Sequence, residues 1–500
     1  MFDICIVGSG SSAVISAKSF IEKGHNVCLI DVGYQSDQTV PLKHFSEHLT
    51  PDSVFFYPSD DASLNAETGS AQITKAREHL ITNVNKYLKL ESDTFSPFQT
   101  LAAGGLSAAW GAACFTYSDS DLKKASIGNL QPHYEAVAKI IGISGPTHSQ
   151  FCKIENKQKP ALLDHNGQSI LKQRQNTFRL EQSSMAMLTE PLDEREPNPY
   201  FDMDFYSNFG GSIFRGDSLL KTLTQHPNFT RIQGALVTSF KEIDDLVEVK
   251  YLELSASTTN QVVASKLVIC AGALNSYRLV ANSLKIFNAP NPILCNPYLN
   301  IPTIHLPNFG KQGSHLRYSL SQLFGEVHGN TDMTLQFYSY RSLLLSRLIE
   351  QTPMPQFLAR LFWRSLVESL VIVGAHFADD GSSQRSIQAI KALSGEALPT
   401  LQVDFPFPIV NGVCALMRNL LKLRCVPIGM VKTKMGASIH YAGTIPISAP
   451  NRHPIGMNEH GLVHATKNVY VFDSSGWTYL PSRGLTFTIM ANTHRLSEAL

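Results

Sequence analysis

Residues 3–33, DICIVGSGSSAVISAKSFIEKGHNVCLIDVG, decide the fold that the rest of the chain must accommodate. An apolar run is followed by a glycine-rich turn, a helical pattern and a second apolar run. Gly8, Gly10 and Ala13 fit the pattern GxGxxG/A. Gly8 permits the tight turn, Gly10 lets the backbone approach a pyrophosphate, and Ala13 is small enough for a helix to pack on a strand. The stretch predicts a strand–helix–strand unit that binds a dinucleotide.

The second apolar run ends in Asp31, at the tip of the predicted second strand. An acid at this place accepts hydrogen bonds from the adenosine ribose. The motif does not separate NAD from FAD, because both cofactors contain the same ADP half. A purely structural strand–helix turn is the alternative interpretation.

Composition limits the classes of protein that fit. The chain has 500 residues, of which 43% are hydrophobic and 17% are charged, so we expect a large core and two domains. Lysine and arginine total 42 against 41 for aspartate and glutamate, so no net charge attracts nucleic acid. We therefore expect no nucleic-acid partner.

Cysteine usage and the start of the chain bear on the compartment. The eight cysteines form no CxxC pair and have no metal-ligand spacing, which indicates buried thiols in a reducing compartment and no metal site. An apolar strand begins at about residue 2, which leaves no room for a secretory signal. No stretch approaches the roughly 18 apolar residues of a membrane-spanning helix. We expect a cytoplasmic protein.

Residues 101–115, LAAGGLSAAWGAACF, contain the second informative block. Each glycine inside a helix costs roughly 1 kcal/mol relative to alanine, so this stretch is a poor helix interior. We interpret it as backbone pressed against a flat ligand. A small-residue turn that packs two elements is the alternative.

Two later blocks complete the nucleotide-binding pattern. Residues 265–283 predict a strand, a small-residue turn and a helix, and residues 467–500 predict a buried strand ending at Asp473, a loop and a helix. An open α/β sheet binds its ligand at the carboxyl ends of parallel strands, where Asp473 stands.

These blocks, together with HxxGT at residues 440–444, resemble the glucose-methanol-choline (GMC) oxidoreductase family of FAD-dependent alcohol oxidases and dehydrogenases. The resemblance implies an α/β fold with an FAD-binding, Rossmann-like domain and a second, antiparallel-sheet substrate domain. The GGLSAAW block is closer to the pyranose oxidase-like branch. Where that branch has a histidine for covalent flavin attachment, this chain has Ala109, which implies non-covalent FAD.

The resemblance also implies a set of cofactor-binding residues, drawn from all of these blocks and from one β-like stretch. They are Gly8, Gly10, Ser11, Ser12, Asp31, Gly104, Gly105, Ser107, Trp110, Gly111, Val237, Ala271, Gly272, Asp473 and Ser474.

His440 falls on the active-site histidine of the family. Alcohol oxidation by a flavin moves a hydride from carbon while the hydroxyl loses a proton, and a neutral imidazole with a pKa near 6.5 accepts that proton near neutral pH. A positioned base is worth roughly 10²–10⁴-fold in rate. A structural histidine held by a neighbouring carbonyl is the alternative.

The chain departs from the family at the second active-site position. Eleven residues after Asp473 the family has asparagine or histidine, but this chain has Gly484. Three interpretations follow: His440 works alone, Arg483 or another residue substitutes, or the flavin site serves a different reaction. A flavin-binding protein with a silent structural or regulatory role is the alternative to a dehydrogenase or oxidase acting on a sugar or lipid-like alcohol.

The expected FAD-binding domain comprises residues 1–140, 200–285 and 426–500, with an insertion or gate at 141–199 and a substrate domain at 286–425. Within the substrate domain, residues 341–374 predict two amphipathic helices broken near Pro353 and Pro355, each with an apolar face edged by arginine. That pattern suits peripheral membrane contact. Packing within the domain or in a dimer is the alternative, and the oligomeric state is left open.

Overall fold

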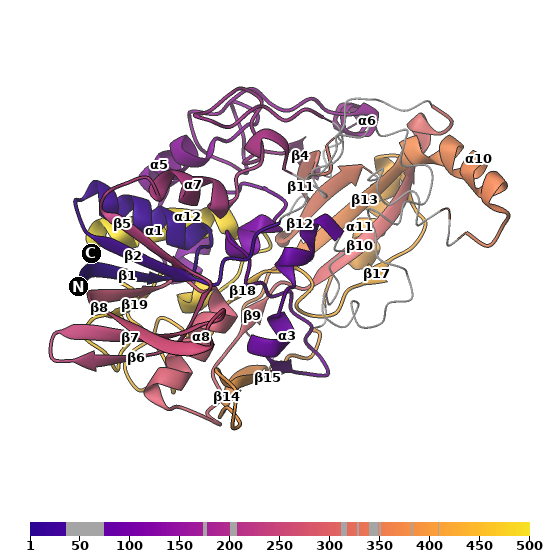
Figure 1. Ribbon diagram of the computed structural model, residues 1–500. Coiled ribbons are helices and arrows are strands. Elements are labelled where there is room, and N and C mark those ends of the chain that lie inside the picture. The colour runs from indigo at the N-terminus through magenta and orange to yellow at the C-terminus, as the bar shows by residue number, and fades with distance from the viewer. Residues whose placement is uncertain are drawn as a thin grey trace.

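The computed structural model describes residues 1–36, 75–173, 178–200, 208–311, 318–327, 330–339, 349, 352–381, 384–408 and 410–500. Within this part of the chain two large sheets organise the molecule, one on the left and one on the right of Figure 1. Both termini lie beside the left-hand sheet.

The first sheet is built around the parallel strands that the glycine motif predicts. Among the described residues its order is β5-β2-β1-β8-β7-β6, with β19 paired to β8. Strands β5, β2, β1, β8 and β19 run parallel, and β8, β7 and β6 form an antiparallel meander. The strands are β1 (Phe2–Val7), β2 (Val27–Asp31), β5 (Phe229–Gln233), β6 (Ala235–Ile243), β7 (Leu246–Glu253), β8 (Thr258–Ile269) and β19 (Val469–Val471).

Both faces of the central strand are buried, which explains its unbroken apolar run. Ile4 and Ile6 pack into the core beneath the helices α1 and α12, whereas Cys5 and Val7 pack into the core on the side of α8. Figure 1 shows these two layers on either side of the sheet. The helices are α1 (Ser11–Glu22), α5 (Gln131–Ile141), α7 (Gly216–Leu223), α8 (Ala273–Leu284) and α12 (Thr486–Ala499).

The second sheet is antiparallel throughout, in the order β16-β10-β13-β12-β11-β4, with β17 paired to β10. Its apolar face packs on α11 and α6, and its other face carries polar side chains. The elements are β4 (Phe178–Gln182), β10 (Tyr298–His305), β11 (Leu323–Val327), β12 (Asn330–Ser339), β13 (Leu370–Phe377), β16 (Cys425–Pro427), β17 (Val431–Lys432), α6 (His165–Lys172) and α11 (Val413–Lys422).

Smaller elements join the two sheets. One short sheet pairs β14 with β15 and β15 with β3, and another pairs β9 with β18. These elements and the remaining α-helices are β3 (Leu90–Glu91), β9 (Leu294–Cys295), β14 (Ser386–Ile390), β15 (Thr400–Asp404), β18 (Tyr441–Ala442), α3 (Val84–Tyr87), α4 (Asp119–Lys124) and α10 (Gln356–Leu366).

Several strands pair or pack across the boundaries between the expected domains. Strand β4 lies in the expected insertion 141–199 but forms the edge of the second sheet. Strands β14 and β15 lie in the expected substrate domain, yet Ile387 and Leu401 pack in the core beneath the first sheet. Strand β17 extends the second sheet to Lys432. Pairing between distant segments decides these boundaries, and local composition does not reveal it.

Two local expectations were wrong. The predicted helix after Pro355 is found as α10, but the chain forms strand β13 from Leu370, because β-branched residues such as Val371 and Ile372 favour a strand. The preceding half of the predicted amphipathic pair lies mostly outside the described residues. Cys414 is exposed, whereas all cysteines were expected to be buried. No helix in the described ranges has the length and apolarity to span a bilayer.

Candidate active site

A pocket opens at the carboxyl ends of β1, β2 and β8 and runs towards the segment around residue 440. Ile439 and Tyr441 line it, whereas His440 between them does not, and Leu485 and Thr486 at the start of α12 line it as well. Most of the residues expected to bind the cofactor line it: Gly8, Gly10, Ser11, Ser12, Asp31, Gly105, Ser107, Val237, Ala271, Gly272, Asp473 and Ser474.

The N-terminus of α1 faces this pocket with its backbone exposed. Gly10 is the N-cap residue, and no side chain caps the helix. A Cβ on Gly10 would meet no protein atom closer than 3.9 Å, so the pocket side is open. Gly8 has φ +100°, and a Cβ there would lie 2.7 Å from the carbonyl oxygen of Cys270. The turn therefore requires glycine, and the uncapped helix end suits an anionic group.

Asp31 lies in the pocket wall, but its carboxylate already has a partner. Both oxygens accept hydrogen bonds from the Arg231 guanidinium at 3.1 Å, and the pair is largely buried. A carboxylate has about four lone-pair sites, so the bidentate arginine leaves acceptor capacity for a ribose hydroxyl. Arg231 is on β5, beside β2, and the sequence pattern did not single it out.

Asp473 also lines the pocket, and protein donors surround its carboxylate. One oxygen accepts from the Gly272 backbone N–H at 3.0 Å and from the Ser276 hydroxyl at 2.5 Å. The other accepts from the Ser475 backbone N–H at 2.9 Å. Burial raises the pKa of Asp473, against the lowering effect of these hydrogen bonds. The side chain joins the end of β19 to the start of α8, where it shapes the pocket.

Three expected cofactor residues do not line the pocket. Trp110 donates its indole N–H to the carbonyl oxygen of Phe214 at 2.7 Å. Gly111 is exposed. Gly104 packs against the start of α7, because a Cβ there would lie 3.1 Å from the backbone nitrogen of Asp217.

Asn296 fixes the tautomer of His440. The Asn296 Nδ2 donates to the carbonyl oxygens of Phe377 at 2.7 Å and of Pro481 at 3.0 Å, which sets the orientation of its amide. Its Oδ1 therefore faces the Nδ1 of His440, at 2.9 Å, as an acceptor. The proton of the neutral imidazole is on Nδ1, and Nε2 has the free lone pair.

The His440 imidazole is one of three neighbouring rings, together with those of His376 and Tyr298. The centroid of the His376 ring lies 5.1 Å from that of the His440 ring, with an angle of 24° between the planes, and 4.4 Å from that of the Tyr298 ring. Burial lowers the pKa of His440 to about 4. Burial, and then the neighbouring His440, hold the pKa of His376 well below its usual value. Both imidazoles are therefore neutral at neutral pH, in the form that accepts a proton.

Gly484, where the sequence resemblance predicts a second active-site side chain, is buried against an aromatic ring. A Cβ on Gly484 would lie 3.4 Å from Cδ2 of Phe115. Phe115 is fully buried and its ring packs 4.1 Å from that of Phe324. Aromatic rings therefore bound the space into which a longer side chain at residue 484 would extend.

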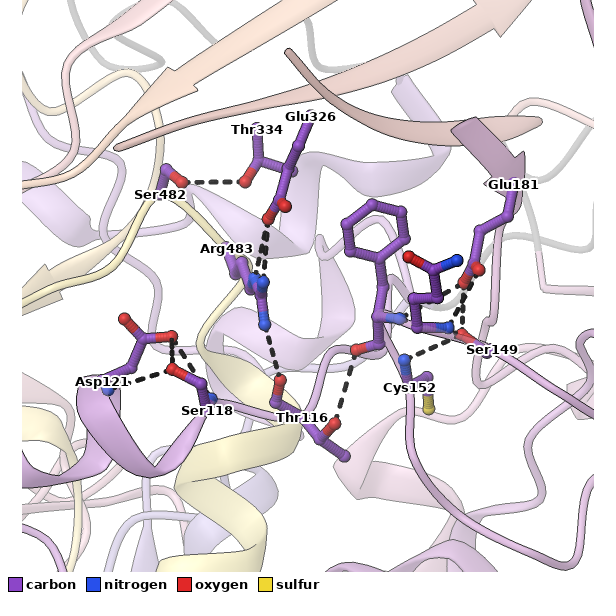
Figure 2. Close-up of polar contacts among 12 residues, drawn as sticks. Thr116, Ser118, Asp121, Ser149, Cys152, Glu181, Glu326, Thr334, Ser482 and Arg483 are labelled. Carbon is purple, nitrogen blue, oxygen red and sulfur yellow. Dashed lines mark hydrogen bonds and ion pairs between the residues drawn. The ribbon is translucent and has the colours of Figure 1, made fainter. Parts of the chain in front are cut away.

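Arg483, the expected substitute, is held by other groups (Figure 2). Its guanidinium donates twice to Glu326, at 2.8 and 3.2 Å, and once to the carbonyl oxygen of Thr116 at 3.1 Å. Next to it, the Ser482 and Thr334 hydroxyls are 2.8 Å apart. The loop of residues 480–484 is thus bound to the polar face of the second sheet.

No protein-family model matches the chain, and no curated protein sequence matches it. Among solved structures, that of pyridoxine 4-oxidase from Mesorbium loti is similar over 99% of this chain and 98% of that one. The TM-score is 0.63 and the sequence identity is 14%. The chain has the fold of pyridoxine 4-oxidase. The similarity and the sheet topology confirm the predicted fold class, an α/β domain with a parallel sheet and a second domain with an antiparallel sheet.

The residues that the sequence analysis missed come from the second sheet and its approach. Asn296 follows the two-residue strand β9, and His376 is near the end of β13, just after the stretch 341–374 that was interpreted as helical. A similarity of 14% to pyridoxine 4-oxidase carries no residue roles. In the sequence, Asn296 and His376 stand out only as polar residues within apolar runs. Such a residue does not by itself show which face of the sheet it occupies.

Proposed function

We propose that this protein is an FAD-dependent oxidoreductase that converts an alcohol to a carbonyl compound, with His440 as the base. The observation that carries the proposal is the hydrogen bond from His440 Nδ1 to Asn296 at 2.9 Å, beside a pocket that includes the uncapped N-terminus of α1 and is lined by Ile439 and Tyr441. This bond leaves Nε2 as the proton acceptor.

The pocket residues suit non-covalent FAD. The uncapped first turn of α1 and the bare backbone at Gly10 suit the pyrophosphate. Asp31 suits the adenosine ribose, and Val237 with its neighbours the adenine. The end near Ile439 and Tyr441 suits the flavin ring. When bound, FAD supplies the acceptor for the hydride that leaves the alcohol carbon.

The protein's own contribution is to hold the alcohol and take its proton. The hydroxyl O–H bond breaks, its proton moves to His440 Nε2, and the carbon–oxygen bond becomes a carbonyl as the hydride leaves. Asn296 accepts from Nδ1 throughout, so it keeps the imidazole oriented as the positive charge develops.

The second sheet favours a polar substrate over a lipid-like one. Its face towards His440 carries Tyr298 and Asn300 on β10 and Thr334 and Gln336 on β12, which are the cross-strand partners of His376 and Gly374 on β13. Although the Tyr298 and Thr334 hydroxyls already bond to protein groups, a face of this polarity suits a hydroxylated molecule such as a sugar or a small heterocyclic alcohol better than a lipid. Pyridoxine is included as a probe because the similar structure is that of pyridoxine 4-oxidase.

The test begins with the visible spectrum of the purified protein, which should show bound flavin released intact by heat. Anaerobic mixing with glucose, pyridoxine, benzyl alcohol and cholesterol should bleach the flavin with at least one of them. His440→Ala should keep the flavin but lower the bleaching rate by roughly 10²–10⁴-fold. Absence of flavin, or full activity of His440→Ala, would refute the proposal.

A further inference from the structure

A second imidazole enters the site from a different part of the chain. His376 is on β13, and its cross-strand neighbours are Tyr298 on β10 and Thr334 on β12. Neighbours in this register share one face of the sheet. Because the His376 ring is stacked 5.1 Å from the His440 ring, this face is the one that meets the proposed base.

His376 makes no hydrogen bond with any residue in the described ranges. Its Nδ1 is buried from solvent and has no hydrogen-bond partner there, whereas Nε2 is not buried to the same degree. Leaving a buried polar atom unsatisfied costs about 1–3 kcal/mol, so such atoms are rare without a reason. Nε2 is thus the nitrogen that a ligand can reach.

The polar groups around His376 are engaged elsewhere. The Tyr298 hydroxyl donates to Asn300 Oδ1 at 2.7 Å, and Thr334 is bonded to Ser482. The Asn296 amide is used by His440 and by backbone carbonyls. Among the described residues, a hydrogen bond thus orients His440, whereas the side chain of His376 is held by ring contacts alone.

The family resemblance predicts a second active-site side chain at residue 484, and this chain has none there, so another residue has to supply it. At residue 484 the chain has a glycine packed on Phe115, and Arg483 is held by Glu326 and Thr116. Neither supplies a group for the alcohol. His376 contacts His440 from the second sheet, and its Nε2 has no hydrogen-bond partner in the part of the chain that the structure describes.

We propose that His376 is a second catalytic residue, whose Nε2–H donates a hydrogen bond to the alcohol oxygen while His440 Nε2 accepts the hydroxyl proton. The inference rests on the proposed function. The balance is unchanged: the O–H bond breaks, the proton goes to His440, and bound FAD would accept the hydride with its two electrons. His376 keeps its own proton and stabilises the charge that develops on oxygen.

Two crossed substitutions separate hydrogen bonding from ring packing. His376→Phe keeps a ring between Tyr298 and His440 but removes the donor, and His376→Asn keeps a donor but removes the ring. The phenylalanine variant should bleach its flavin roughly 10²-fold more slowly than the wild type. The asparagine variant should lose less than roughly tenfold, because it retains one hydrogen bond. The reverse order would show that His376 only packs and would overturn the proposal.

A second measurement does not depend on turnover. In the holoenzyme labelled with nitrogen-15 at histidine, trifluoroethanol serves as an alcohol that is a poor hydride donor. Its addition should shift the His376 Nε2 signal, identified by its absence in His376→Phe. A shift of the His440 signal alone would overturn the proposal. If no alcohol bleaches the wild-type flavin, the proposed function fails, and this titration still decides whether His376 binds a hydroxyl.

Discussion

One carboxamide decides which nitrogen of His440 can act as a base. Asn296 donates to two carbonyls on one side, so it must accept on the other, and the imidazole has to present Nδ1–H to it. The fixed tautomer and the pKa of about 4 together keep Nε2 unprotonated at neutral pH. Neither feature is encoded next to His440 in the chain, because Asn296 lies 144 residues away.

Gly484 shows the same dependence on distant packing, and it yields a stability prediction. Gly484→Ala should be tolerated, because its Cβ would be at the ordinary contact distance of 3.4 Å from Phe115. Gly484→Asn extends towards the ring and should cost about 1–3 kcal/mol through overpacking. Melting followed by circular dichroism measures the difference.

The control for this prediction is Phe115→Ala, which opens the space next to residue 484. In that background Gly484→Asn should cost less than in the wild type, a coupling that a double-mutant cycle measures. Strictly additive costs would show that Phe115 does not limit the side chain at residue 484.

At the scale of elements, the local signals predicted what depends on neighbours in sequence. The strand, turn and helix of residues 3–33 are found as β1, α1 and β2, because the glycine turn and the apolar runs act within thirty residues. The end of residues 341–374 was misjudged, because its apolar run fits a helix or a buried strand equally well. Pairing with β10 and β12 decides that it is β13.

Helix α10 is the part of residues 341–374 whose exposed surface we expect to contact a membrane. Figure 1 shows it at the right-hand end of the molecule, away from the first sheet. Phe357 is 65% exposed, Leu361 58% and Phe362 46%, and no acid lies between Pro355 and Leu366. An apolar face beside arginines suits an anionic lipid surface.

We therefore expect the protein to sediment with phosphatidylserine vesicles more than with phosphatidylcholine vesicles. Phe362→Glu should reduce that binding severalfold, because it places a charge in the apolar face. Leu393→Glu is the matched control, since Leu393 is 74% exposed in a loop and should not affect binding. If Phe362→Glu instead converts a dimer to a monomer without vesicle binding, the helix is a subunit contact.

At the scale of the whole molecule, burial of histidines links stability to pH. Burial lowers the pKa of one group of them: His133, His305 and His440 to about 4, His376 well below its usual value, and His453 and His494 also downward. The unfolded chain, with histidine pKa values near 6.5, binds more protons than the folded protein between pH 6.5 and about 4. Their contribution is complete above pH 6.5 and is lost as the pH falls towards 4.

Two buried acids change the stability with pH in the direction opposite to that of the histidines. Burial raises the pKa values of Asp379 and Asp473, so the stability that these two acids contribute decreases as the pH rises. Six histidines against two acids should still lower the melting temperature by several degrees between pH 7.5 and pH 5.

His133 and His494 join α5 to α12 through Nδ1 atoms 3.0 Å apart, so His494→Gln should flatten this dependence. His460→Gln, at a side chain that is 63% exposed, should leave it unchanged. A melting temperature that rises on acidification would contradict the assignment, because it would require the acids to outweigh the histidines.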